Sequence, residues 1–164
     1  MTAGERVPLL HSLYETRLQI EELLPKIDPE KEIFPGWRIK QLLAHIAGWD
    51  DATIDALRAH ELGLSPSIPA IHSLTEYNNL TTSTRRDHSL DQVLVEWRQK
   101  RQVLLDMLEQ MPEERFLESI AVPWGKQTTI ARLVEIFSHH EKEHARDIIE
   151  WLKAPEKPLG KEGK

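Results

Sequence analysis

Four long segments of this chain repeat their apolar residues every three to four positions, and proline or glycine separates them. A residue advances about 100° around a helix, so such a repeat gathers the apolar side chains on one face. Proline ends a helix because its ring clashes with the preceding turn and its nitrogen has no hydrogen to donate. We therefore predict four amphipathic helices, at Pro8–Leu24, Trp37–Leu62, Leu90–Met111 and Thr128–Leu152.

The connection over residues 63–89 is long for a compact domain. Ser73 with Glu76 three positions later has the pattern of a helix-capping box, so we predict a short helix at Leu74–Thr84. The stretch Phe116–Gln127 is predicted to be irregular, and no part of the chain shows a convincing β-strand pattern. The predicted fold is therefore all-α, a four-helix bundle with a long crossover between the second and third long helices.

Length and composition indicate one soluble domain, with 164 residues, 40% hydrophobic and 29% charged. We expect residues 1–154 to form this domain and residues 155–164, rich in Lys, Glu, Pro and Gly, to form a flexible tail. Ser89, with Gln92 three positions later, is expected to cap the third long helix, and Thr128 the fourth. Gly48, inside the second long helix, either allows close packing or weakens the helix.

The charge and the missing cysteines exclude several classes of function. A net charge of −6 without any basic block argues against a nucleic-acid partner. No apolar run reaches the roughly 18–20 residues of a membrane span, and the first residues do not resemble a signal peptide. The absence of cysteine excludes disulfides, cysteine–zinc sites and a cysteine nucleophile. We expect a cytoplasmic protein in which any thiol chemistry requires an external thiol.

Three histidines are candidate ligands of one metal ion. His140 and His144 lie four positions apart within the apolar stripe of the last helix, where imidazole is costly to bury without a partner. Side chains at this spacing are neighbours and can bind one ion together. His45, on the apolar side of the second long helix, offers a third nitrogen. The alternative is that these are core histidines whose hydrogen bonds are satisfied within the protein.

A catalytic site of this kind keeps three protein ligands and one open position for water or substrate. Three nitrogens bind zinc, nickel or manganese. Asp147, near the His140 face, is a candidate to orient a ligand imidazole, and Glu141, beside the same stripe, is a candidate general base. Trp49 lies one turn beyond His45 and is a candidate wall of the site. The alternative for the two acids is that they are simply solvated.

Residues 140–144 also match H-E-x-x-H, the zinc-protease motif. That motif needs a third ligand further along the chain and usually a strand that binds the peptide, but only 20 residues follow His144 and no strand is predicted. We therefore do not favour a protease. The remaining histidines have no partner at a suitable spacing and are interpreted as ordinary surface or core residues: His11, His60, His72, His88 and His139.

Several motifs in a fixed order resemble the DinB/YfiT-like superfamily of four-helix-bundle metalloenzymes, and the resemblance covers about residues 8 to 152. The separate pieces are short, and their order and spacing make the combination specific. They are the run Trp37–Asp50 around His45, Tyr77-Asn78 in the crossover, Pro123-Trp124-Gly125 before the last helix, and His140-x-x-x-His144 followed by Asp147-Ile148.

The resemblance implies an up-down-down-up bundle, frequent homodimers and a divalent metal on the positions that match His45, His140 and His144. Relatives in this superfamily include S-transferases and isomerases that use low-molecular-weight thiols, and a branch of self-protection hydrolases. Tyr77-Asn78 and the Pro-Trp-Gly motif are similar to the second branch, whose members do not always retain all three histidines. This chain has all three, which favours a metal-using protein.

Two classes of function follow. We expect a metal-dependent enzyme that activates water or an external small thiol against a small electrophilic substrate, as a hydrolase or a thiol S-transferase. The alternative is a non-catalytic bundle that binds a ligand or a protein, with a structural metal or none. A structural site is usually closed by four protein ligands, so a fourth ligand would favour this alternative. A homodimer is expected in either class.

Overall fold

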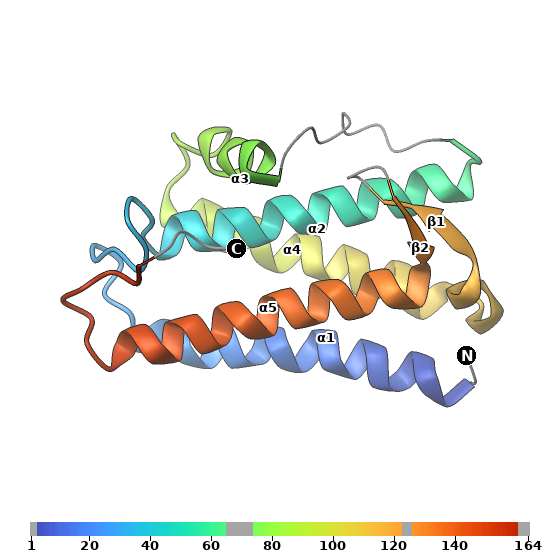
Figure 1. The fold of residues 1–164 in the computed structure, drawn as a ribbon, viewed down its shortest axis with the longest axis horizontal. Coiled ribbons are helices and arrows are strands. Elements are labelled where there is room, and N and C mark those ends of the chain that lie inside the picture. The colour runs from blue at the N-terminus through green and yellow to red at the C-terminus, as the bar shows by residue number, and fades with distance from the viewer. Residues whose placement is uncertain (1–2, 65–73, 123–125, 161–164) are drawn as a thin grey trace.

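The computed structural model describes residues 3–64, 74–122 and 126–160. Four long helices form the predicted bundle: α1 (Ala3–Leu23), α2 (Ile39–Glu61), α4 (Leu90–Gln110) and α5 (Ile130–Leu152). In Figure 1, α1 and α2 run in opposite directions, the crossover makes α4 parallel to α2, and α5 runs parallel to α1. The most extensive contacts are those of α2 with α4 and of α1 with α5. This confirms the all-α bundle and the up-down-down-up order.

The helix starts follow from side-chain caps. The Ser89 hydroxyl accepts a hydrogen bond from the backbone N–H of Gln92 (3.1 Å), and the Gln92 side chain accepts one from the backbone N–H of Ser89 (2.7 Å). This is the predicted capping box of α4. The cap of α5 is Thr129, which accepts the N–H of Arg132 at 3.1 Å, and not the predicted Thr128. Among the described residues, no helix is both long and apolar enough to cross a membrane.

The first helix is longer than predicted. It begins at Ala3, so that Pro8 lies in its second turn, and it ends in one 3-10 turn, η1 (Leu24–Lys26), that contains Pro25. Only the first four N–H groups of a helix have no partner within it, and Pro8 lies beyond them, so its missing N–H costs α1 one hydrogen bond in the second turn. The proline signal therefore placed the end of this helix better than its beginning.

A small hairpin replaces the irregular stretch that we predicted between α4 and α5. After the 3-10 turn η2 (Glu113–Leu117), strand β1 (Ser119–Ala121) pairs antiparallel with β2 (Gln127–Thr129), and Ile120 lies opposite Thr128. The prediction of no strand is therefore wrong, since strands of three residues are too short to show an alternating pattern. Pro123-Trp124-Gly125 lies outside the described residues.

The C-terminal segment also differs from the prediction. Residues 155–160 fold back on the bundle instead of forming a flexible tail. The backbone N–H of Leu159 donates to the carbonyl of Ile33 at 2.7 Å, and the Leu159 side chain packs against the core. An ion pair between Lys31 and Glu156 lies beside this contact. One apolar side chain and one backbone hydrogen bond hold this polar segment, and periodicity does not reveal such contacts.

The crossover carries the predicted short helix, α3 (Leu74–Ser83), which lies against α2 (Figure 1). The Tyr77 hydroxyl donates to the carbonyl of Gly48 at 2.8 Å. A Cβ atom on Gly48 would lie 2.6 Å from the Cβ of Thr81 and would overlap its Cγ2. Of the two interpretations of this glycine, the structure therefore supports close packing. Ser73, of the predicted capping box, lies outside the described residues.

The core consists of two apolar clusters, and buried polar side chains lie between them. The cluster beside the hairpin includes Leu13, Ala52, Leu104, Phe116 and Phe137. The cluster at the other end includes Ile20, Ala47, Trp97, Ala145 and Trp151. Each long helix contributes apolar residues to both clusters. Between the two clusters, each of these helices also contributes one buried charged residue.

These four residues, Arg17, Asp50, Arg101 and Glu141, are named here the four-helix ion cluster. Arg17 Nε lies 2.7 Å from Glu141 Oε1, and Arg17 Nη2 lies 3.0 Å from Asp50 Oδ2. Arg101 Nη2 lies 3.1 Å from Asp50 Oδ1 and also pairs with Glu141. Two positive and two negative charges therefore balance inside the bundle, and the pairs link all four long helices.

The pKa values show how far these charges depend on each other. Burial alone would raise the pKa of Glu141, but the charges and hydrogen bonds of Arg101 and Arg17 outweigh it and lower that pKa. Burial alone would lower the pKa of Arg101, and Asp50 and Glu141 raise it instead. Both groups therefore stay ionised, because each charge compensates the cost of burying the others.

Replacing Gly48 by alanine tests the packing of α3. In an open helix this change stabilises by about 1 kcal/mol, because glycine is the poorer helix former. Here the overlap with Thr81 is expected to outweigh that gain and to lower the free energy of unfolding by about 1–3 kcal/mol. Denaturant unfolding measures the difference. Gly160→Ala, where an added Cβ meets nothing within 4 Å, is the control; a Gly48→Ala variant more stable than the parent would contradict the packing.

The ion cluster is tested by Arg101→Met, which leaves carboxylates buried without one of their partners. We expect the free energy of unfolding to fall by about 3–5 kcal/mol. The control is Arg132→Met, because Arg132 pairs with Glu135 at 2.9 Å on the exposed side of α5 and such pairs contribute about 0–1 kcal/mol. Similar losses in both variants, measured by denaturant unfolding, would show that the buried pairs are no more important than a surface pair.

Candidate metal centre

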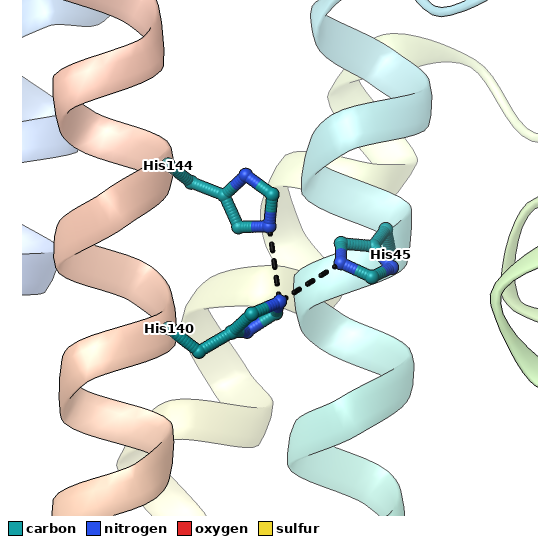
Figure 2. A group of neighbouring side chains, drawn as sticks. All are labelled: His45, His140 and His144. Carbon is teal, nitrogen blue, oxygen red and sulfur yellow. Dashed lines mark hydrogen bonds between the residues drawn. The ribbon is translucent and has the colours of Figure 1, made fainter. Parts of the chain in front are cut away.

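Three histidines from two helices meet at one point between α2 and α5 (Figure 2). His45 comes from α2, and His140 and His144 come from successive turns of α5. His140 Nε2 lies 3.2 Å from His45 Nε2 and 3.0 Å from His144 Nε2. The candidate ligand atoms all lie within 4.8 Å of one another. The structure therefore brings together the three residues that the sequence singled out.

The spacing of these nitrogens fits a shared ion. A tetrahedral zinc site with Zn–N distances of about 2.0–2.1 Å places its nitrogens about 3.3 Å apart, close to the two separations in this structure. The donor set consists of imidazole nitrogens, which suit zinc and nickel better than manganese, an ion that prefers oxygen. Without a metal, the same nitrogens are close enough to hydrogen bond with each other. The alternative interpretation, that these are core histidines with satisfied hydrogen bonds, requires such distances.

Access to the three rings is unequal. His45 and His144 are 0% and 1% exposed, whereas His140 is only half-buried. The ring centroid of His45 lies 5.2 Å from that of Trp37, which covers one side of the centre. Solvent or a small molecule would therefore reach the centre from the side of His140.

Asp147 lies where the sequence suggested that it could orient a ligand. Its Oδ2 is 3.5 Å from Nδ1 of His144, one turn earlier on α5. That separation is longer than an N–H···O hydrogen bond of about 2.7–3.2 Å, so Asp147 acts on the ring as a nearby negative charge. With its side chain 34% exposed, Asp147 remains accessible to solvent.

Glu141 does not have the surroundings of a general base. Its two oxygens are taken up by Arg17 and Arg101, its side chain is 1% exposed, and its lowered pKa disfavours proton uptake. Glu141 follows His140 directly, and a step of about 100° around the helix points it into the middle of the bundle. The structure therefore contradicts the prediction that Glu141 serves as general base, because its partners are buried arginines and not a substrate.

Three members of the ion cluster were not identified from the sequence. The sequence signal for their burial is that each lies inside an apolar stripe: Arg17, Asp50 and Arg101. A charged residue in such a stripe needs a partner, but periodicity does not identify that partner on another helix. His139, by contrast, is exposed as predicted and lies 3.3 Å from Glu143 on the polar face of α5.

Solved structures with the same fold are similar over most of the chain. The DfsB protein described as a sibling lethal factor precursor has 18% sequence identity and a TM-score of 0.74, over 90% of this chain and 95% of its own. The colibactin self-resistance protein ClbS, solved in complex with double-stranded DNA, has 15% identity and a TM-score of 0.72, over 91% and 96%. YfiT from Bacillus subtilis, described as a probable metal-dependent hydrolase with an unusual four-helix bundle topology, has 14% identity and a TM-score of 0.68, over 93% and 89%.

At these identities the solved structures establish the fold alone. No curated protein is similar enough in sequence to be matched. The family described as the mycothiol maleylpyruvate isomerase N-terminal domain matches residues 30–141, more than half of the chain. The match includes His45 and His140 and ends before His144. The chain therefore belongs to the mycothiol maleylpyruvate isomerase N-terminal domain family, within the DinB/YfiT-like superfamily.

Proposed function

We propose that this protein is a metal-dependent enzyme in which His45, His140 and His144 hold one divalent ion. The convergence of the three imidazoles carries the proposal: His140 Nε2 lies 3.2 Å from His45 Nε2 and 3.0 Å from His144 Nε2, and both separations are close to those of a tetrahedral site. Zinc and nickel suit the all-nitrogen set best. A bound ion of this kind lowers the pKa of water or deprotonates a thiol at its open position.

The number of ligands favours catalysis over a structural role. Among the described residues, the cluster of possible metal ligands contains these three histidines and no fourth residue. A structural zinc site is usually closed by four protein ligands, whereas a catalytic site keeps one position open. Glu141, the nearest carboxylate in sequence, is held by arginines and does not supply a fourth ligand.

Residues around the ion would then have separate roles in the reaction. The negative charge of Asp147, 3.5 Å from Nδ1 of His144, would favour the tautomer that carries its proton on Nδ1 and leaves Nε2 free to bind the ion. Because Glu141 is tied to two guanidinium groups, Asp147 is also the one of our two candidate carboxylates that can accept a proton. His140 is half-buried, and a small electrophilic substrate would reach the metal centre from its side.

The attacking group is water or an external small thiol, since the chain has no cysteine. The family's name refers to a thiol-dependent isomerase, and YfiT is described as a hydrolase, so each mechanism has one supporting relative.

The second candidate function is a non-catalytic bundle. It is favoured by the hydrogen-bond distances of His140 Nε2 to the other two imidazoles. A homodimer and the absence of nucleic-acid binding stay predictions of the sequence; ClbS, solved with DNA, is only a distant neighbour.

Metal analysis of untagged protein tests the centre. After loading with zinc or nickel and removal of free ion, we expect about one ion per chain, as for one three-histidine site. His144→Ala should weaken binding by more than the roughly 10–100-fold that follows loss of an outer-shell partner. His139→Ala is the matched control, because His139 is exposed on the same helix. Equal binding by the two variants, or none by the parent, would return these histidines to the core interpretation.

The reaction is tested with a panel of small electrophiles, with and without low-molecular-weight thiols. Turnover that requires thiol would support transfer, and turnover without thiol would support hydrolysis, because the ion activates either nucleophile. In both cases we expect activity to disappear in His144→Ala and to persist in His139→Ala. Product formation is followed by mass spectrometry, and turnover that survives both metal removal and His144→Ala would exclude the mechanism.

A further inference from the structure

A cavity of about 500 Å³ lies between α2, α3 and α4, and it is named here the crossover cavity. Its volume is within the range of about 300–1,000 Å³ that small-molecule sites have. None of the three candidate metal ligands lines it. Asp51, which does, follows His45 by six residues and therefore lies about 120° around α2 from it. The crossover cavity is thus separate from the candidate metal centre.

Polar contacts fix the walls of the crossover cavity relative to one another. Asp51 on α2 pairs with Arg85, just after α3, at 2.9 Å and with Lys100 on α4 at 2.8 Å. The Tyr77 hydroxyl of α3 donates to the carbonyl of Gly48 at 2.8 Å. Burial, followed by the charge of Asp51, raises the pKa of Tyr77 to about 12, so the phenol stays neutral and keeps this bond. Walls held in this way are typical of a largely preformed ligand site.

Part of the cavity lining is apolar, and each of the three helices contributes to it: Ile54, Leu80 and Val103. Ile54 is only 4% exposed and belongs to the apolar cluster beside the hairpin, whereas Leu80 is 50% exposed. Covering the exposed part of a leucine removes apolar surface from water and is favourable. The lining therefore favours a ligand with a hydrocarbon body.

The charged part of the lining leaves one positive group available to a ligand. Arg85 pairs with Asp51 and Glu96, and Lys100 pairs with Asp51. Arg58 forms no ion pair or side-chain hydrogen bond with any residue that the structure describes. It follows Asp51 by seven residues and so lies about 10 Å further along α2. Its planar guanidinium group presents pairs of N–H donors that match the two oxygens of a carboxylate.

We propose that the crossover cavity is a second ligand site, which binds a small amphipathic carboxylate. Arg58 pairs with the carboxylate of this ligand, and the hydrocarbon chain lies along the apolar side of the cavity. The site needs neither the metal nor its histidines, so the proposal goes beyond the proposed function. Because Asp55 also lines the cavity, an amphipathic cation is the competing class of ligand, and the test includes it.

Three probes with the same hydrocarbon chain test the proposal: octanoate, neutral octanamide and octylammonium. Titrations are followed by the backbone amide signals in proton–nitrogen NMR spectra of the labelled protein. We expect octanoate to bind most tightly, about 2–5-fold better than octanamide, and to shift the signals of residues that line the crossover cavity. Tighter binding of octylammonium, or no saturable binding of octanoate up to millimolar concentration, would overturn the proposal.

Substitutions of exposed residues test the two parts of the site. Arg58→Gln should weaken octanoate binding by about 2–5-fold and remove its preference over octanamide. Its control is Arg146→Gln, at an exposed arginine outside the cavity. Leu80→Ala should weaken both probes by about 2–5-fold, because it removes apolar contact. Its control is Leu74→Ala, also on α3, 55% exposed and outside the lining. If either variant behaves like its control, the proposed site is wrong.

Zinc separates this inference from the proposed function. Octanoate should bind with equal affinity with and without zinc, and equally to His144→Ala, because other residues line the crossover cavity. This result would support the second site even if the protein bound no metal. Octanoate binding that requires zinc and shifts the signals of His45, His140 and His144 would instead place the carboxylate on the metal. The second site would then be wrong, and the metal function would stand.

Discussion

The arrangement of the whole bundle depends on four charges buried at one level. Removing a charge from water costs several kcal/mol even after the protein relaxes, so Arg17, Asp50, Arg101 and Glu141 are tolerated only if all of them meet. They come from α1, α2, α4 and α5, and each guanidinium contacts both carboxylates. A helix that slid or rotated by one residue would leave at least one charge unpaired. We infer that the ion cluster sets the register of the four helices.

This register also places the candidate metal centre. Glu141 is the residue after His140, so the arginines that hold its carboxylate also hold that turn of α5 opposite α2. The two apolar clusters are packed above and below this polar level, and Trp37 and Trp49 belong to different clusters on the two sides of the histidines. The centre is therefore packed against apolar side chains on its buried side. The half-buried His140 gives it one side towards solvent.

The surroundings of Glu141 explain why H-E-x-x-H does not indicate a protease in this chain. The motif needs its glutamate near the metal-bound water, whereas here the side chain points into the bundle and is neutralised by two arginines. Two histidines of the motif keep the spacing that suits a metal, because four residues are about one turn. The same five-residue motif thus occurs in a bundle fold in which the candidate third ligand, His45, comes from another helix.

The sequence by itself determined the helices, their order and the candidate ligands. Apolar periodicity is a local property, and it placed His45, His140 and His144 on inward faces before any contact was known. Only the tertiary structure decided which inward polar groups pair. Nothing local links Arg17 to Glu141, or Gly48 to Thr81, because these contacts depend on how separate helices cross. For the same reason, the sequence does not predict the arginine partners of Glu141 or the docking of Leu159. The two strands escape prediction because three residues are too few to show an alternating pattern.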